Sequence, residues 1–286
     1  MIIGEWEIHQ LDYGRFRMDG GALFGIIPRK LWARAYPHMD EDNRVELVTQ
    51  GLLIRNGERI IVVDAGIGTK ISDKERSIFD IRQGASPVAQ ALEKFGVLPE
   101  QVTDFLYTHL HFDHAGGATV LGHGGDVIPQ FANARHYVQA EQLEWARTPS
   151  MKDRASYISA NWDVVIANGM MEVVHGPVDF CPGVHLTPLH GHTPGMQMIL
   201  ISDSARIAKP LLFSVDLFPT AAHLPPHYVA AYDNFPLAAL AEKEKVLARA
   251  EQEGWIVMFG HDPFILGGTV RRNDRGAWEI AERLTI

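Results

Sequence analysis

The sequence predicts a layered α/β fold with two packed β-sheets. Short β-rich segments occur in both halves of the chain, and helical patterns lie between many of them. Apolar residues make up 46% of the 286 residues, which is ordinary for a globular protein and sufficient for a large core. No repeat or linker interrupts the pattern, so we expect a single domain over residues 1–286.

The first half of the chain contains four strand patterns and one helix pattern. Apolar alternation or β-rich runs predict strands over residues 6–11, 45–54, 59–63 and 105–108. Asn56-Gly57 between the second and third of these is the strongest short signal for a hairpin. A helix is expected from Pro87, with Ser86 as its N-cap and Gly96 as its terminator.

The second half alternates strands and helices more regularly. Strands are expected over residues 135–139, 184–189, 196–201, 211–215 and 255–259. Helices are expected over residues 140–147 and 236–253, and the second is rich in Ala, Leu, Glu and Lys, which favour helices.

Charge and cysteine content exclude several classes of protein. Lys and Arg number 26 and Asp and Glu 35, so the formal net charge is −9, which disfavours nucleic-acid and anionic-membrane partners. The single cysteine, Cys181, allows neither an intramolecular disulfide nor a cysteine metal cluster. The first residues lack a basic segment followed by an apolar run, and no stretch approaches the ~20 apolar residues of a membrane span. We therefore expect a cytoplasmic protein.

Four metal-binding residue types lie within a window of six. His109 and His111 would point the same way in an extended loop and could bind one ion, while Asp113 and His114 follow a turn and could face a second ion. Imidazole and carboxylate groups are good ligands for zinc and similar divalent ions. A surface histidine cluster is disfavoured, because a buried strand leads into the motif and Ala115-Gly116-Gly117 follows it.

Three further ligand-type residues follow predicted strands. His192 lies in a turn between two strands, Asp216 ends an apolar run, and His261 follows the last buried strand. Each residue alone would be read as a structural loop residue. Together with the His109–His114 motif, they indicate a convergent metal site.

This order of ligand residues resembles that of the metallo-β-lactamase superfamily. The resemblance implies an αββα four-layer sandwich with two divalent metal ions at one edge of the sheets. It implies His109, His111 and His192 on one ion. It implies Asp113, His114 and His261 on the other, with Asp216 bridging them. Asp64 matches the family's strand-end aspartate, which holds loop backbone beneath the ions. Zinc is expected, although manganese, cobalt and iron(II) also suit these ligands.

Individual positions point to a hydrolase branch of the superfamily. Histidine rather than glutamate at position 111 favours hydrolysis over di-iron redox chemistry. Aspartate rather than cysteine at position 216 disfavours one class of true β-lactamase. Residues 18–32, 108–117 and 216–233 are similar to segments of quorum-quenching lactonases of the YtnP type. This similarity implies opening of the lactone ring of N-acyl-homoserine lactones by a metal-bridged hydroxide.

The same resemblance implies further features of the site. Asp113 and Asp216 would be catalytic, with Asp113 orienting the nucleophile and passing a proton to the leaving group. Residues 12–43 would form a loop or flap near the pocket or a dimer interface, and the protein would be a homodimer. The expected substrate pocket consists of Met18, Leu23, Phe24, Ile26, Trp32, Phe218, His223 and Tyr232. Many lactonases have a tyrosine where this chain has Pro219, so its role at the substrate carbonyl would fall to the metal or to another residue such as Tyr232 or His223.

Two other functions remain open. An organophosphate triester, aryl ester or thioester hydrolase could use the same dinuclear centre. A non-catalytic metal-binding module is disfavoured, because such proteins usually lose ligand residues and all seven are present here.

Overall fold

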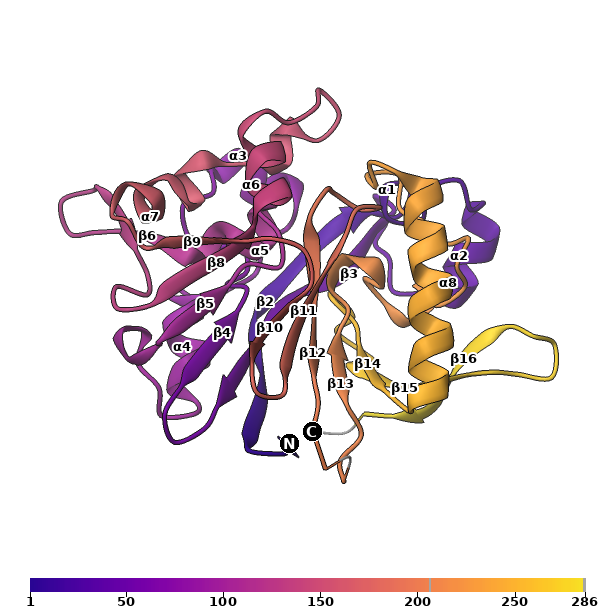
Figure 1. Ribbon diagram of the computed structural model, residues 1–286. Coiled ribbons are helices and arrows are strands. Elements are labelled where there is room, and N and C mark those ends of the chain that lie inside the picture. Colours follow the sequence, from indigo (N-terminus) through magenta and orange to yellow (C-terminus); the bar gives the residue numbers. More distant parts are fainter. Residues whose placement is uncertain (206, 285–286) are drawn as a thin grey trace. The chain divides into compact units, whose positions relative to one another are not determined.

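The computed structural model describes residues 1–205 and 207–284. The chain divides into two compact units: unit 1 comprises Met1–Phe16 and Thr49–Gly176, and unit 2 comprises Arg17–Val48 and Pro177–Ile286. Two seven-stranded sheets form the framework of these units (Figure 1).

The first sheet, most of whose residues belong to unit 1, has the strand order β1-β2-β3-β4-β5-β8-β9. Its strands are β1 Ile2–Ile3, β2 Trp6–Asp19, β3 Arg44–Arg55, β4 Ile60–Val63, β5 Asp104–Leu106, β8 Arg135–Gln139 and β9 Met171–Val174. Strands β3 and β4 are antiparallel neighbours, which confirms the hairpin predicted at Asn56-Gly57. From β4 to β9 the strands are parallel, so the residues that follow β4 and β5 emerge at the same edge of the sheet.

The helices of unit 1 are short and lie beside strands β4, β5 and β8 (Figure 1). They are α3 Asp73–Ile78, α4 Pro87–Glu93, α5 Phe112–Ala115, α6 Ala140–Arg147 and α7 Asp163–Ala167, and a small hairpin of β6 Thr119–Leu121 and β7 Val127–Pro129 follows α5. Phe105 belongs to the buried cluster of this unit, and its ring centroid lies 4.7 Å from those of Tyr107 and Phe131. This core fixes the end of β5, from which the His109–His114 motif begins.

The sheet of unit 2 runs in sequence order from β10 to β16. Its strands are β10 Val178–Cys181, β11 Val184–Leu189, β12 Met196–Ile201, β13 Leu211–Phe213, β14 Ile256–Met258, β15 Gly267–Arg272 and β16 Trp278–Arg283. All neighbours are antiparallel except β13 and β14. The parallel pair sends the segments carrying Asp216 and His261 out of the same edge of the sheet.

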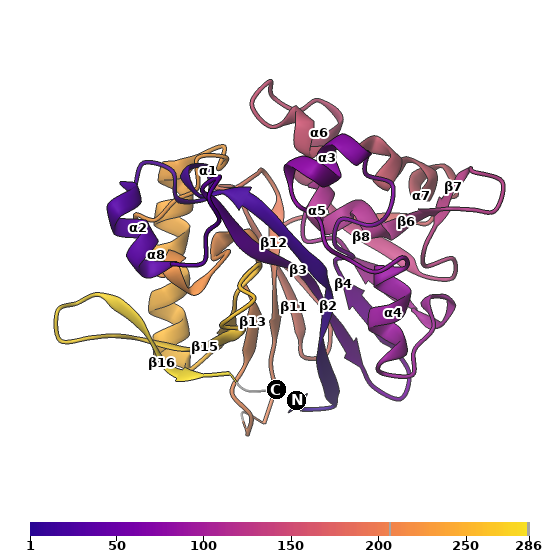
Figure 2. The ribbon, with the colours of Figure 1, turned by 180° about the vertical axis from the view of Figure 1, so that it is seen from behind.

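Helix α8, Pro236–Glu253, connects β13 to β14 and packs against β15 (Figures 1 and 2). Two other helices of unit 2 come from the N-terminal part of the chain, α1 Gly20–Phe24 and α2 Arg29–Ala35. Two 3₁₀ turns, Val215–Leu217 and Ala221–His223, follow β13. These turns begin the connection that leads from Asp216 to α8.

Most predicted elements agree with the structure, and the differences are local. The predicted bounds of residues 135–139, 140–147, 184–189, 196–201 and 236–253 match those of β8, α6, β11, β12 and α8. Residues 12–43, expected as a loop or flap, instead begin within β2 and contain α1 and α2. Ser86 precedes α4 as expected, but its side chain makes no capping hydrogen bond. None of the described helices is long and apolar enough to cross a membrane.

Shortening Phe105 to alanine should destabilise the protein strongly. The side chain is 0% exposed, and large-to-small changes at such sites cost about 3–5 kcal/mol in unfolding free energy because they leave a cavity. Urea unfolding followed by circular dichroism measures the loss. Leu121→Ala, at a side chain that is 52% exposed, is the control and should change stability by less than about 0.5 kcal/mol. Equal effects of the two changes would contradict this assignment of the core.

Candidate metal centre

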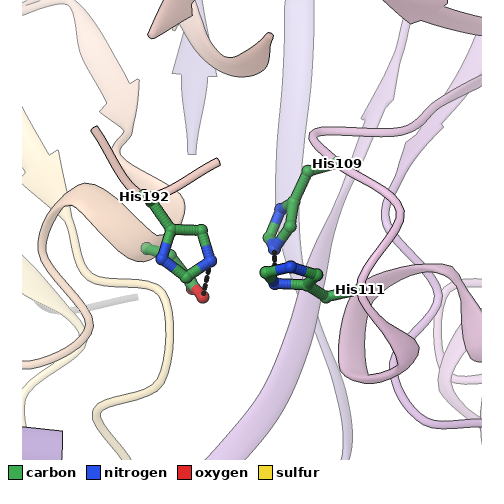
Figure 3. A group of neighbouring side chains, drawn as sticks. His109, His111 and His192 are labelled. Atoms are coloured by element: carbon green, nitrogen blue, oxygen red, sulfur yellow. Dashed lines mark hydrogen bonds and ion pairs between the residues drawn. The ribbon is translucent and has the colours of Figure 1, made fainter. Parts of the chain in front are cut away.

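Unit 1 presents His109, His111, Asp113 and His114 on the segment that follows β5. All four side chains are buried, with exposures between 0% and 7%. The Nε2 atom of His109 lies 3.1 Å from Nδ1 of His111 (Figure 3). Two nitrogen ligands of one tetrahedral zinc ion, each about 2.0 Å from the metal, lie about 3.3 Å apart. The pair is therefore spaced as two ligands of a single ion would be.

Hydrogen bonds beneath this segment fix which nitrogen of His109 carries the proton. The Thr108 hydroxyl donates to Asp64 Oδ2 at 2.7 Å, so its oxygen can only accept from His109 Nδ1, which lies 3.1 Å away. His109 thus carries its proton on Nδ1. The lone pair on Nε2 faces His111, as metal binding requires.

Asp64 organises the rest of the unit 1 donor set. Its carboxylate accepts the backbone N–H of Thr108 at 2.8 Å and faces His114 Nδ1 at 2.9 Å. Complete burial raises the pKa of the Asp64 carboxyl group, while His114 and Thr108 act in the opposite direction. Asp64 has a φ of 57°, in the left-handed region of the backbone map. Residues other than glycine adopt this conformation infrequently. Its contacts agree with the predicted role of holding the loop beneath the metal ligands.

Unit 2 presents His192, Asp216 and His261. Asp216 places its Oδ1 atom 2.8 Å from Nε2 of His261 and its Oδ2 atom 3.1 Å from Nε2 of His192. The two oxygens of one carboxylate therefore face two different imidazoles. A carboxylate that bridges two cations has this arrangement, with one oxygen directed toward each ion.

The opposite nitrogens of both imidazoles face fixed acceptors. Nδ1 of His192 lies 2.7 Å from Asp233 Oδ1, and Nδ1 of His261 lies 2.9 Å from the carbonyl oxygen of Val48. When each Nδ1–H donates to its acceptor, the Nε2 atom of a neutral ring carries a lone pair that is directed at the Asp216 carboxylate. A lone pair on Nε2 and a lone pair on the carboxylate oxygen repel each other at such short range unless a cation lies between them. The donor set therefore fits divalent cations.

The backbone around Asp216 is held in an unusual conformation. Val215 has a φ of 50°, which is strained for a β-branched residue. A Cβ atom on Gly260 would lie 2.5 Å from the carbonyl oxygen of Val215, so only glycine fits in the neighbouring loop. The backbone N–H of His261 donates to the carbonyl of Pro219 at 2.7 Å. These contacts lock the Asp216 and His261 segments to each other within unit 2.

The His192 turn is clamped by the segment that precedes α8. The backbone N–H groups of Asn234 and Phe235 donate to the carbonyls of His192 and Gly191 at 2.9 and 2.8 Å. Asp233 also accepts the N–H of Ala230 at 3.1 Å, so its carboxylate is fixed from two sides. Sequence reasoning did not assign a role to Asp233. Its only signal was its place in a segment that resembles lactonases.

The expected pocket residues lie in unit 2 with different degrees of burial. Phe24 stacks on Trp32 and on His223, with ring centroids 4.9 and 4.7 Å apart. Leu23 and Phe218 are buried as deeply as these three rings, whereas Ile26 is 92% exposed and Met18 is half-buried. Tyr232 is half-buried, and its ring meets that of His192 edge-on at 5.7 Å.

Of the two residues expected to replace the missing tyrosine, His223 uses both of its ring nitrogens in hydrogen bonds within the protein. Its Nδ1 lies 2.8 Å from Thr220 Oγ1, and its Nε2 lies 3.1 Å from the carbonyl oxygen of Leu23. Burial, with a contribution from Lys243, lowers the pKa of His223 to about 3. Tyr232 is therefore the one of the two that lies beside a metal-donor residue.

Curated relatives are N-acyl homoserine lactonases. This chain is 28% identical over 177 residues to the enzyme of a Bacillus species, covering 61% of this chain and 62% of that protein. The match thus spans less than two thirds of that relative. It is 26% identical over 236 residues to the lactonase AttM of Azorhizobium caulinodans, covering 76% of this chain and 83% of that protein.

Solved structures with the same fold cover the whole chain. A probable metal-dependent hydrolase from Staphylococcus aureus superposes with a TM-score of 0.85 at 30% identity, covering 100% of both chains. AidC, a dizinc quorum-quenching lactonase solved with the product N-hexanoyl-L-homoserine, gives a TM-score of 0.81 at 19% identity, covering 100% of this chain and 97% of that chain. These neighbours confirm the fold class expected from the sequence.

The family of this chain is assigned from a profile match that covers most of its length. The profile of the metallo-beta-lactamase superfamily matches residues 45–261, a range that begins in β3 and ends at His261. It contains Asp64 and the donor residues of both units, from His109 to His261. The chain belongs to the metallo-beta-lactamase superfamily and is a hydrolase of that family.

Proposed function

We propose that the seven donor residues bind two divalent cations, and that these are zinc. The observation that carries the proposal is the Asp216 carboxylate, whose two oxygens face two separate histidines. One ion would be bound by His109, His111 and His192, the other by Asp113, His114 and His261, and Asp216 would be shared. The family match over residues 45–261 and the dizinc centre named for AidC support this assignment.

We further propose that the reaction is hydrolysis of the lactone ring of N-acyl-homoserine lactones. The curated relatives carry this activity in their names, and AidC was solved with the ring-opened product. The chemistry supplied by two divalent ions is Lewis acidity toward a carbonyl group and acidification of water. Addition of water to the carbonyl carbon breaks the ring C–O bond and gives an N-acyl-homoserine.

Two side chains of the protein would supply proton transfer and contact with the substrate. Asp113 is 7% exposed, and its Oδ2 lies 3.8 Å from Nε2 of His114, so its carboxylate is held at the edge of the unit 1 donor set. We assign it the proton transfer, from the attacking water to the ring oxygen that leaves. We assign contact with the substrate to Tyr232, whose ring lies beside that of His192.

A panel of substrates tests the reaction. Metal-loaded protein should open short-chain and long-chain N-acyl-homoserine lactones, measured by proton release, and a chelator should abolish the activity. Paraoxon-type triesters and p-nitrophenyl esters serve as comparison substrates. Faster turnover of a triester or an aryl ester with no lactone opening would overturn the substrate assignment and leave the metal centre intact.

Asn substitutions separate the two aspartates' roles. Asp113→Asn should lower kcat by about 10²-fold or more, the usual contribution of a positioned proton-transfer group. Asp216→Asn should also reduce the zinc content, because a neutral amide bridges two cations poorly. Metal analysis and steady-state kinetics check both variants. Wild-type rates with full metal content in both would refute the assignment.

Asp233 should control metal affinity without touching the metal. Replacing it with asparagine weakens the acceptor of the His192 Nδ1–H, and such changes typically cost 10- to 100-fold in metal affinity. Competition with a chelator measures the affinity. Asp179→Asn is a matched control, because Asp179 forms the same kind of contact with His185 at 2.6 Å on the surface. Similar affinities for wild type and Asp233→Asn would argue against the role given to His192.

A further inference from the structure

Lys243 is a buried lysine in the middle of helix α8. Its side chain is 2% exposed and lies on the helix face formed by Ala239, Val246, Leu247 and Ala250. Such a face normally carries only apolar residues, because removing an ammonium group from water is unfavourable. Burial lowers the pKa of Lys243 to about 7, although the negative charge of Asp233 acts to raise that pKa. We therefore expect the buried ammonium group to have a specific role that offsets the unfavourable burial.

The contacts of its ammonium group are with backbone carbonyls. Nζ donates to the carbonyl of His223 at 3.1 Å and also to the carbonyl of Tyr228. It lies 5.5 Å from the centroid of the Phe218 ring, a cation–π contact. His223 ends a 3₁₀ turn, where carbonyl groups lack partners within the turn and favour a positive charge.

Those carbonyls belong to the connection that joins two carboxylates of unit 2. The connection starts after Asp216, which faces His192 and His261, and ends at Asp233, which accepts the Nδ1–H of His192. Between these ends the chain forms irregular turns and no strand. Lys243 holds it at two points from the neighbouring helix.

We propose that Lys243 is a positioning residue for the metal centre: by holding the connection at His223 and Tyr228, it keeps the Asp233 carboxylate at the Nδ1–H of His192. The proposal rests on the proposed function only in taking His192 as a metal ligand. Lys243 itself contacts none of the metal-donor residues in the hydrogen bonds described above. Its effect on them would pass through residues 223–233, and the attraction between its charge and the Asp233 carboxylate would act in the same direction.

Hydrogen exchange tests the proposal without any substrate. In Lys243→Met, which keeps the length of the side chain but removes the donors, the amides of Asn234 and Phe235 should exchange at least about tenfold faster, because the segment that bears them loses its anchor. Zinc affinity, measured by chelator competition, should fall by about tenfold in parallel. Lys243→Gln retains an N–H donor and should restore part of both properties. Lys245→Met, at an exposed position of the same helix, should leave both unchanged.

The outcomes separate this proposal from the proposed function. Unchanged exchange of the Asn234 and Phe235 amides in Lys243→Met would overturn the positioning role. Failure of both Lys243 variants to fold would also overturn it, since Lys243 would then serve the core as a whole. Faster exchange and weaker zinc binding, in a protein whose wild type opens no lactone, would support the positioning role and refute only the substrate.

Discussion

The hydrogen bond from a histidine Nδ1–H to a fixed acceptor is the interaction on which both donor sets depend. His114 donates to Asp64, His192 to Asp233 and His261 to the carbonyl of Val48. Each bond fixes the tautomer and the orientation of its ring, so that the Nε2 lone pair faces the place where a cation would bind. Because the rings are buried, losing an acceptor would also leave a polar group unsatisfied, which is costly.

The backbone supports these bonds at the carboxyl ends of parallel strands. Strands β4 and β5 deliver Asp64 and the His109 segment to one edge of their sheet, and β13 and β14 do the same for Asp216 and His261. Asp64 and Val215 both have positive φ, which costs roughly 1–3 kcal/mol at each position. Rigid, apolar strands leading into both segments maintain that strain, which places the carboxylates where a regular strand could not.

Interactions far from the donor atoms extend this support. Asp233 holds the ring of His192, and Lys243 holds the connection that carries Asp233. The buried ammonium group stabilises carbonyls at the end of an irregular turn, where no strand neighbour is present. The donor set of unit 2 is therefore supported by α8 as well as by the strands that lead into its donor segments.

The sequence by itself determined the elements whose patterns are local. Strand and helix bounds such as 135–139 and 236–253 follow from apolar periodicity and caps, and the His109–His114 motif is legible because its residues are adjacent. Only the tertiary structure decided the partners of these residues. Asp233 lies 41 positions from His192, and Val48 lies 213 from His261. Every residue has a carbonyl, so no sequence pattern distinguishes the one that Lys243 or His261 will bind, and that choice is made by packing.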